Sequence, residues 1–381
     1  MTDNTLKPGL ESVIAAETRL SSVDGQRGEL IVAGFPVEAL AGNATFEETV
    51  YLLWHDVLPT ASQLAQFRAD LARRRELPQA TLDLLKEAAA QKSLVMDALR
   101  MAAGTLSLST TGSASASEAE EEALTLVAAF PTIVAACWRW LHGDEPIAPQ
   151  ADLGHAANYL YMLAGESPRP EQVRAMETYL NTVADHGFNA STFAARVIIS
   201  TQSDMISAIA GAVGALKGPL HGGAPGPALD MVFEIKETAR AESYLRDKLE
   251  RGERLMGFGH RVYKVRDPRA EVLGTAVERL YQSGGDKALY ELARHVEATA
   301  VALLAEYKPG RNLQTNVEFY TALLLHGLGL PTELFSPTFA VSRVAGWTAH
   351  CFEQQQTGRL IRPSASYIGV KDRRWVPVEE R

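Results

Sequence analysis

Apolar residues recur at helical spacing along almost the whole chain from residue 45 onward. In the first such segment Phe46, Val50 and Leu53 fall on one helical face, and Thr45 with Glu48 three positions later is typical of an N-terminal capping box. Similar periodicity covers residues 60–75, 78–90, 93–105, 119–142, 152–164, 170–184, 191–200, 203–216, 227–251, 268–283, 288–308, 312–327 and 338–358. Units that alternate a strand with a helix are missing, which excludes a doubly wound α/β sheet.

Strands are indicated only near the N-terminus. Residues 17–22 and 28–33 flank Val23-Asp24-Gly25-Gln26, and Asp-Gly is a strong signal for a hairpin turn. We therefore expect an all-α fold that opens with a short β-hairpin.

The strongest break in the helical pattern lies at residues 218–227, which hold four glycines and three prolines. We expect a smaller helical domain to follow this break, over residues 222–323. The large multi-helix domain is then formed by residues 1–221 and 324–381, on either side of the insertion.

The composition excludes several classes of function. The chain has 381 residues with 37 basic and 46 acidic side chains, so its formal net charge is −9. Nucleic acids and anionic membranes favour a basic excess, and we expect neither as a partner. Cys137 and Cys351 lack the paired spacing of a zinc site and suit a reducing compartment. The apolar run at 124–133 is too short to span a membrane and residues 1–10 lack a signal-peptide core, so we expect a cytoplasmic protein.

Four short segments place titratable groups beside glycine or proline, where backbone can approach a ligand closely. They are residues 184–189 with His186, 217–224 with His221, 256–264 with His260, and 316–320 with Glu318. A carboxylate between apolar neighbours, as at Glu318, is expected to have a raised pKa and so to serve as a general base. Each signal alone has a structural alternative: a histidine that ends a helix, a buried Asp185–His186 pair, or an exposed helical glutamate.

Other catalytic motifs are missing from the sequence. The histidines at positions 55, 142, 155, 295, 326 and 350 lack a comparable loop context, and we expect them at the surface or in packing contacts. No histidine pair has the four-residue spacing of a metal site with a third ligand nearby, so we expect no bound metal. A serine nucleophile elbow, a phosphate loop and a dinucleotide fingerprint are also missing, which argues against serine hydrolase, ATP and NAD chemistry.

Basic residues gather in one stretch of this acidic chain. Between residues 260 and 269 lie Arg261, Lys264, Arg266 and Arg269 against the single acid Asp267. Arg343 follows an apolar run, and Arg362 precedes a proline. Arginine binds carboxylates through a fixed fork of donors, so arginines that converge with histidines indicate a polycarboxylate site. For Arg261 and Lys264 a solvated basic face is the alternative.

These segments, in this order on a helical chain, closely resemble the citrate synthase family. The likeness runs from about residue 9 to residue 369. Its most specific parts are Leu220-His221-Gly222-Gly223-Ala224, Gly257-Phe258-Gly259-His260-Arg261-Val262-Tyr263 with Asp267-Pro268-Arg269, Ser342-Arg343-Val344-Ala345-Gly346-Trp347, and Arg362-Pro363 with Ser366-Tyr367-Ile368-Gly369. One such motif would mean little, but the ordered set is specific.

The resemblance implies an enzyme that condenses acetyl-CoA with oxaloacetate and hydrolyses citryl-CoA to citrate and CoA. This is the first reaction of the citric acid cycle, and it requires no cofactor. Glu318 stands where the family's carboxylate removes a proton from the acetyl methyl group. His221 would then hydrogen-bond the thioester oxygen, and His260 would donate to the oxaloacetate carbonyl.

The resemblance also implies binding residues and a homodimer that closes over its substrates. Oxaloacetate would be held by His186, Arg269 and Arg343, together with Arg362 of the partner subunit. The CoA phosphates would be met by Arg261, Lys264, Lys308 and Arg311. The length is that of the shorter members of the family, so a dimer is expected and a higher assembly of dimers stays open.

Three positions depart from the family pattern. Glu318 replaces the usual aspartate, and a displacement of about 1 Å at a catalytic group can cost roughly a hundredfold in rate. Val183 and Pro225 stand where histidine and asparagine are frequent, and both border the expected oxaloacetate pocket. Two alternatives to citrate synthase therefore stay open: a 2-methylcitrate synthase that uses propionyl-CoA, and a catalytically weak paralogue with a binding or assembly role. Acetyl and propionyl groups differ by one methylene, which a hydrophobic pocket separates by only ~1–3 kcal/mol.

Overall fold

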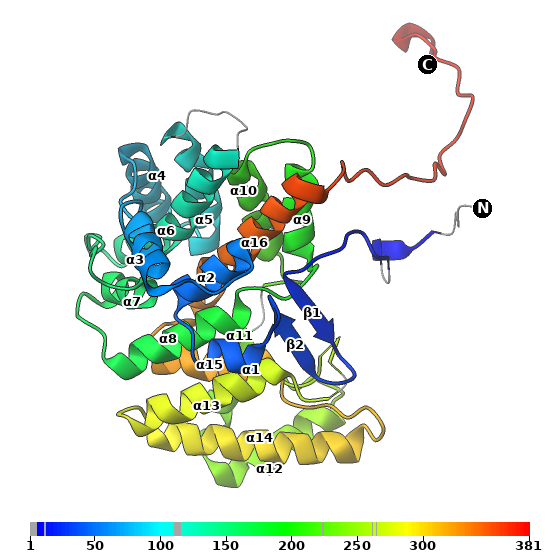
Figure 1. The fold of residues 1–381 in the computed structure, drawn as a ribbon. Coiled ribbons are helices and arrows are strands. Elements are labelled where there is room, and N and C mark those ends of the chain that lie inside the picture. The colour runs from blue at the N-terminus through cyan, green and yellow to red at the C-terminus, as the bar shows by residue number, and fades with distance from the viewer. Residues whose placement is uncertain (1–5, 11–12, 110–115, 223–224, 261, 264) are drawn as a thin grey trace.

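The computed structural model describes residues 6–10, 13–109, 116–222, 225–260, 262–263 and 265–381 (Figure 1). The described chain is mainly α-helical with one small antiparallel sheet, which confirms the predicted fold class. The strands are β1 (Ser21–Asp24), β2 (Glu29–Val32) and β3 (Phe35–Pro36). The helices are α1 (Val37–Ala41), α2 (Phe46–His55), α3 (Ala61–Ala72), α4 (Gln79–Ala90), α5 (Val95–Thr105), α6 (Ala116–Leu141), α7 (His155–Ala164), α8 (Pro170–Val183), α9 (Ala190–Ile199), α10 (Met205–Leu216), α11 (Pro225–Ile235), α12 (Thr238–Glu250), α13 (Pro268–Gln282), α14 (Lys287–Tyr307), α15 (Val317–Gly327) and α16 (Phe335–Thr357).

The hairpin turn lies two residues later than the sequence predicts. β1 stays paired through Asp24, and residues 25–28 form the turn. The Asp24 carboxylate accepts hydrogen bonds from the backbone N–H groups of Gln26 and Arg27 at 2.9 and 3.0 Å, which stabilises this longer turn. Gly28 closes it with a φ of +65°, a conformation that glycine adopts without strain.

The helix starts follow local capping chemistry. The predicted capping box is present at α2, where the Glu48 N–H donates to Thr45 Oγ1 and the Thr45 N–H donates to the Glu48 carboxylate at 2.8 Å. The helix predicted over 312–327 begins only at Val317, because Asn316 caps it.

Two other helix boundaries also differ from the prediction. The helix predicted over 227–251 is divided into α11 and α12 by Lys236, whose φ of +65° interrupts the helical backbone. The helix predicted over 338–358 begins three residues earlier, at Phe335, directly after a 3-10 turn formed by Thr332–Leu334.

α6 is a core helix that contacts α4, α5, α7 and α16. Its segment Glu118–Leu141 is longer than the apolar run expected at 124–133, and by length and composition alone it could cross a membrane. However, 72% of its most apolar window is buried inside the protein. Its hydropathy therefore reflects a central position in the helical core.

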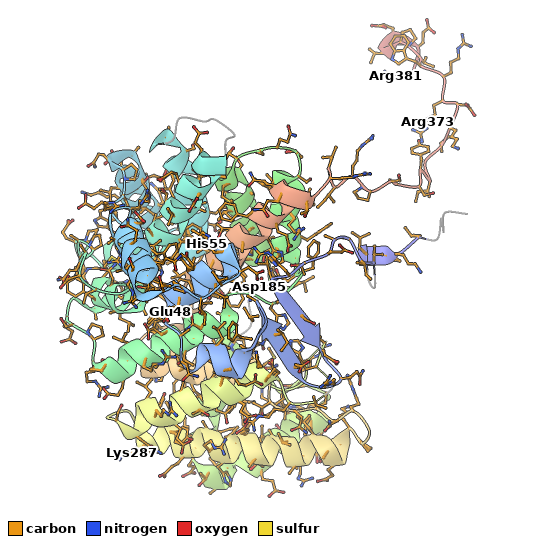
Figure 2. The ribbon with its side chains drawn as sticks, in the orientation of Figure 1. Glu48, His55, Asp185, Lys287, Arg373 and Arg381 are labelled. Carbon is orange, nitrogen blue, oxygen red and sulfur yellow. The ribbon has the colours of Figure 1, made fainter. Side chains whose placement is uncertain are left out.

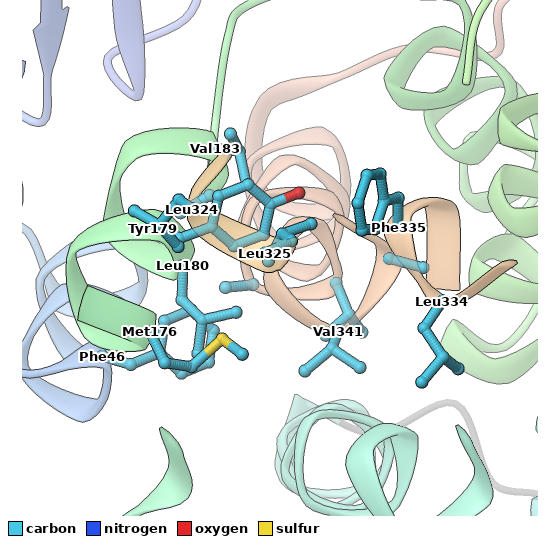
Figure 3. Close-up of a cluster of buried hydrophobic side chains, with 14 of the residues drawn as sticks. Phe46, Met176, Tyr179, Leu180, Val183, Leu324, Leu325, Leu334, Phe335 and Val341 are labelled. Carbon is cyan, nitrogen blue, oxygen red and sulfur yellow. The ribbon is translucent and has the colours of Figure 1, made fainter. Parts of the chain in front are cut away.

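Three helices that carry or directly precede predicted site residues pack together in one apolar core. Figure 3 shows part of this cluster, with Phe46, Met176, Tyr179, Leu180, Val183, Leu324, Leu325, Leu334, Phe335 and Val341 labelled. Burial of apolar surface is the main favourable term in folding, so this core fixes α8, α15 and α16 relative to one another. α8 ends just before His186, α15 begins just before Glu318, and α16 carries Arg343.

Figure 1 shows α12, α13 and α14 as a group on one side of α8 and α1, with α13 packed against both of these helices. The sheet lies at the edge of the molecule, where this group meets the other helices. Both termini leave the helical body as extended segments, and Figure 2 shows Arg373 and Arg381 on the C-terminal one.

Candidate active site

His186 lies in the turn after α8, between two residues that are tied to distant parts of the fold. Asp185 is fully buried, and its carboxylate accepts hydrogen bonds from Ser21 Oγ at 2.5 Å and from His350 Nε2 at 3.1 Å. Gly187, with a φ of +60°, donates its N–H to Ser21 Oγ at 2.7 Å. The backbone on both sides of His186 is therefore fixed.

His350 is the central member of a buried chain of charged and polar groups. Arg196 can only donate, and its Nη1 lies 3.1 Å from Nδ1 of His350, so Nδ1 accepts and the Nε2–H donates to Asp185. Arg196 also donates to the Glu353 carboxylate at 2.6 Å. Although burial acts to raise the pKa of Asp185, interactions with His350 and Arg343 hold it well below its usual range.

From the sequence we expect His350 at the surface or in a packing contact, and the sequence did not predict this hydrogen-bonded network. Arg343 and His350 are seven positions apart, so two turns of α16 bring them to one helical face. That spacing was the available signal. Both residues interact electrostatically with Asp185, which lies more than 150 positions away in the sequence.

His260 is oriented by the backbone that follows it. Its Nδ1 accepts hydrogen bonds from the N–H groups of Val262 at 3.0 Å and Tyr263 at 3.1 Å, so a neutral ring carries its proton on Nε2. The ring centroids of His260 and His186 are 6.2 Å apart, and the Tyr263 hydroxyl lies 3.1 Å from Nε2 of His186. Burial, together with Arg269, holds the pKa of His186 well below its ordinary value, so this imidazole is neutral at pH 7.

Arg269 is a buried cation held by a neighbouring carboxylate. Its Nε and Nη2 donate to the two oxygens of Asp267 at 3.0 and 2.8 Å, in the bidentate geometry that arginine favours. Asp267 also caps α13 by accepting from the Arg269 N–H, and it accepts from the Val317 N–H at 3.3 Å. Nη2 of Arg269 lies 3.4 Å from Nε2 of His260, a longer contact than the two backbone N–H groups make with Nδ1, so these N–H groups decide that Nδ1 is the acceptor.

Glu318 occupies the second position of α15, a half-buried site close to this ion pair. Asn316 accepts from the Glu318 N–H at 3.0 Å, and its own amide donates to the Gly259 carbonyl at 2.9 Å. These bonds join the start of α15 to the loop that carries His260. Burial raises the pKa of Glu318, Arg269 opposes that rise and Asp267 reinforces it.

His221 follows α10 and is oriented by a serine. Its Nε2 lies 2.7 Å from Ser191 Oγ, which accepts a hydrogen bond from the Trp347 indole at 3.0 Å and donates one to Asn189 Oδ1 at 2.8 Å. Burial, with a smaller contribution from Arg343, lowers the pKa of His221 to about 4. The imidazole is therefore neutral at pH 7.

Arg343 is buried on α16. Its Nε donates to the Val183 carbonyl at 2.7 Å, and its guanidinium lies 4.4 Å from the centroid of the Phe339 ring. Burial lowers the pKa of Arg343 to about 10, with Asp185 acting in the opposite direction, so the group stays cationic at pH 7. Val183, where histidine is frequent in the family, thus contributes its carbonyl while its side chain joins the apolar core.

Two of the remaining predicted residues that the structure describes, Lys308 and Arg362, do not join this cluster. Arg311 and His260 line one cavity of about 260 Å³, and Lys308 is exposed at the end of α14. Arg362 is exposed on the extended C-terminal segment. Arg261 and Lys264 lie outside the described residues. Within the described part of the chain, no three metal-binding side chains come together.

The assembled site combines neutral imidazoles, buried guanidinium cations and a carboxylate of raised pKa. Two fixed cations can receive a dicarboxylate, because bidentate pairing favours carboxylate oxygens. A carboxylate of raised pKa can remove a proton, while neutral imidazoles can donate hydrogen bonds to developing oxyanions. Together these groups can form an enolate and stabilise it beside a bound polycarboxylate.

Comparisons with known proteins agree with this chemistry. Residues 9–364 match the family model described as "Citrate synthase, C-terminal domain". The chain is 42% identical to citrate synthase of Haloferax volcanii, with 99% of each chain covered. It is also 41% identical to 2-methylcitrate synthase of Shewanella oneidensis, with 98% of this chain and 97% of that protein covered.

Solved structures show the same fold. Citrate synthase from Pyrobaculum aerophilum superposes with a TM-score of 0.89 at 39% identity, covering 98% of this chain and 95% of that one. The ternary complex of citrate synthase from Thermoplasma acidophilum with carboxymethyl coenzyme A and oxaloacetate superposes with a TM-score of 0.88 at 31% identity, covering 99% and 100%. The family model covers residues 9–364, and both the related sequences and the solved structures match nearly the whole chain. The chain therefore belongs to the citrate synthase family.

Proposed function

We propose that this enzyme condenses acetyl-CoA with oxaloacetate and hydrolyses the resulting citryl-CoA to citrate and CoA. The observation that carries the proposal is the position of Glu318, a carboxylate of raised pKa near the Arg269–Asp267 pair and the loop of His260. A general base of this kind contributes typically 10²–10⁴-fold to a proton transfer.

In the proposed first step, the Glu318 carboxylate removes a proton from the acetyl methyl group. The negative charge that develops on the thioester oxygen is stabilised by a hydrogen bond from Nδ1–H of His221. Nδ1 carries that proton once Ser191 turns its O–H from Asn189 Oδ1, to which it donates at 2.8 Å, toward Nε2 of His221 at 2.7 Å. The Trp347 indole can only donate and so occupies one lone pair of Ser191 Oγ, which leaves the serine O–H for Asn189 Oδ1 or for His221.

In the second step, the methylene carbon attacks the carbonyl carbon of oxaloacetate, and the Nε2–H of His260 donates a hydrogen bond or its proton to the carbonyl oxygen as negative charge develops there. The N–H groups of Val262 and Tyr263 on Nδ1 keep Nε2 as the protonated nitrogen. Water then hydrolyses the citryl-CoA thioester and releases CoA with a free thiol.

The substrate-binding roles are proposed on charge and position. His186, Arg269 and Arg343 receive oxaloacetate, whose two carboxylates match the two buried guanidinium groups. Arg311, close to His260, and the exposed Lys308 meet the CoA phosphates, and Arg261 and Lys264 are proposed for the same role.

The assembly is proposed to be a homodimer, in which Arg362 of the partner subunit completes the oxaloacetate site. The C-terminal segment supports this, because it leaves the helical body and exposes large apolar side chains, with Ile368 96% and Trp375 76% exposed. Apolar side chains on an extended arm favour burial against another chain. We also propose that residues 222–323 form the small domain that closes on the substrates, and that the enzyme is cytoplasmic, with Cys137 and Cys351 as buried free thiols.

A second candidate activity is 2-methylcitrate synthesis from propionyl-CoA, which is favoured by the 41% identity to a protein of that name. Steady-state release of CoA thiol with oxaloacetate and either acetyl-CoA or propionyl-CoA tests both. We expect the larger kcat/KM with acetyl-CoA. A larger value with propionyl-CoA assigns the second activity, and no release with either supports the weak paralogue.

A further inference from the structure

The β1–β2 hairpin touches both segments that carry the histidines of the proposed oxaloacetate site. At the start of β1, Ser21 Oγ donates to the Asp185 carboxylate at 2.5 Å and accepts from the Gly187 N–H at 2.7 Å. These two residues immediately flank His186. The Ser21 hydroxyl therefore holds the residues on both sides of His186.

At its tip, the hairpin abuts the loop that follows His260. A Cβ atom at Gly25 would lie 2.2 Å from the Val262 carbonyl oxygen, and one at Gly28 would lie 2.6 Å from a methyl carbon of Val265. Real Cβ atoms essentially never approach other heavy atoms so closely, so the backbone of the turn itself rests on this loop. Figure 1 shows the hairpin at the edge where the α12–α14 group meets the other helices.

The contact at Gly25 reaches the imidazole of His260 through a single residue, Val262. The carbonyl beneath Gly25 belongs to Val262, whose N–H donates to Nδ1 of His260 at 3.0 Å. The segment before His260 is held at Gly257 and Gly259, whose backbone carbonyls accept hydrogen bonds from the N–H and the side-chain amide of Asn316. A displacement of Val262 therefore moves His260 or breaks the hydrogen bond that sets its tautomer.

The base of the hairpin is anchored in the core, so it can act as a fixed support. Leu20, Leu30 and Val32 are completely buried, and α1 packs against both β2 and β3. Its contact with Asp185 and Gly187 and its contact with Val262 and Val265 lie at opposite ends of one short element.

We propose that the β1–β2 hairpin is a positioning element of the active site, which sets His186 through Ser21 and His260 through Gly25. This inference rests on the proposed function, in which His186 binds oxaloacetate and His260 acts on its carbonyl during bond formation. The two ends of the hairpin then have separable effects. Loosening His186 weakens substrate binding, and displacing His260 slows the chemical step.

Three substitutions test the proposal. Gly25→Ala adds a clash with Val262 at a position whose φ alanine tolerates, and Ser21→Ala removes both hydrogen bonds beside His186. Gly34→Ala is the matched control, because Gly34 has a φ of +85° and a Cβ added there would meet no atom within 4 Å, so it strains the same region without a clash. Each variant is assayed for kcat and KM of oxaloacetate, for oxaloacetate affinity by calorimetry, and for its thermal midpoint.

We expect Gly25→Ala to lower kcat about tenfold to a hundredfold, since the clash requires a shift of about 1 Å. Ser21→Ala should raise both KM and the dissociation constant of oxaloacetate about tenfold and change kcat less than about threefold. Gly34→Ala should stay within about twofold of the parent. Should Gly25→Ala fail to fold, Ser21→Ala decides alone.

Two results would overturn the proposal: parental kinetics in Gly25→Ala and Ser21→Ala, or the same losses in Gly34→Ala, which would indicate loss of hairpin stability. Failure of the proposed function has a different signature. In that case the parent protein itself neither binds oxaloacetate nor releases thiol.

Discussion

Trp347 donates its indole N–H to Ser191 Oγ across 3.0 Å, and the same oxygen lies 2.7 Å from Nε2 of His221. The indole thus occupies one lone pair of the serine, and the serine O–H has two acceptors within reach, Asn189 Oδ1 at 2.8 Å and Nε2 of His221. Because His221 is neutral at pH 7, the tautomer of its ring depends on this serine. The direction of the Ser191 O–H, to Asn189 or to His221, therefore sets which nitrogen of His221 carries the proton.

Ser191→Ala should therefore lower kcat by about tenfold to a hundredfold, as expected when a hydrogen bond to a developing oxyanion is weakened. KM for oxaloacetate should change little, because Ser191 is not among the proposed oxaloacetate ligands. Steady-state kinetics measure both parameters. The matched control is Thr201→Ala, since Thr201 is exposed just after the same helix and its hydroxyl donates to the Ile198 carbonyl. Equal kcat in Ser191→Ala and the parent would contradict this role.

His350→Ala should destabilise the fold and weaken oxaloacetate binding together. It leaves the buried Asp185 carboxylate and the Arg196 guanidinium each without one partner, which costs about 2–4 kcal/mol in the free energy of unfolding. Chemical denaturation measures that loss. His142→Ala, at an exposed position, should change the stability by less than about 0.5 kcal/mol. A fully stable His350→Ala would show that the buried chain of polar groups is not needed.

Glu177 makes the stability depend on pH. Burial and the nearby Glu47 raise its pKa to about 7, against the opposing effect of Arg174. The folded protein therefore holds a proton that the unfolded chain releases above its ordinary pKa of 4.5, so stability falls as the pH rises from about 4.5 to 7. Glu177→Gln should remove this loss, which amounts to roughly 2–3 kcal/mol.

The measurement is the thermal midpoint of parent and Glu177→Gln between pH 5 and pH 8. The variant should gain stability relative to the parent as the pH rises. Glu171→Gln, an exposed position on the same helix, is the control and should follow the parent. A constant difference between parent and Glu177→Gln at every pH would be inconsistent with a raised pKa.

The shared active site predicts complementation between two inactive variants. Arg362→Ala and Glu318→Gln should each have low activity, because one lacks the partner's arginine and the other lacks the base. In randomly mixed dimers, roughly a quarter of the sites carry neither substitution, so about a quarter of the parental activity should return. Arg359→Ala, on the same exposed segment, is the control and should be active alone. Absence of any recovery in mixed dimers would refute the contribution of Arg362 across the interface.

Much of the fold could be predicted because local signals agree with the tertiary structure. The Thr45–Glu48 capping box and most helical segments are present as predicted, since their apolar faces meet one continuous core. The turn after β1 is misplaced because the Asp24 carboxylate stabilises a longer turn than Asp-Gly alone indicates. Lys236 breaks a predicted helix without any glycine or proline as a warning.

The candidate site could be predicted only as a set of separate motifs. His186, His260 and Arg269 come together as expected, but the residues that hold them do not resemble site residues in sequence. Ser21 lies 164 positions from Asp185, and a serine in a predicted strand carries no signal of such a contact. The sequence predicts only a surface or packing role for His350, because a histidine within a helix is usually structural. Contacts of this length depend on the packing of whole helices, which periodicity does not describe.

The raised pKa of Glu318 predicts that activity falls at acid pH. The carboxylate must be ionised to remove a proton, so kcat/KM for acetyl-CoA should rise with pH, with a midpoint above the ordinary glutamate value of 4.5. Glu318→Asp should shift this midpoint and reduce the rate, because the shorter side chain moves the carboxylate by about 1 Å. If Glu318→Asp is much faster than the parent, the site keeps the geometry for aspartate.

The most direct test of the account is CoA thiol release from acetyl-CoA and oxaloacetate by the parent and by Glu318→Gln. The glutamine keeps the size and hydrogen-bonding oxygen of glutamate but cannot accept the methyl proton. The account predicts rapid release by the parent and a loss of about a thousandfold or more in the variant, with oxaloacetate binding retained. Release by Glu318→Gln at the parental rate would contradict the assignment of Glu318 as the catalytic base.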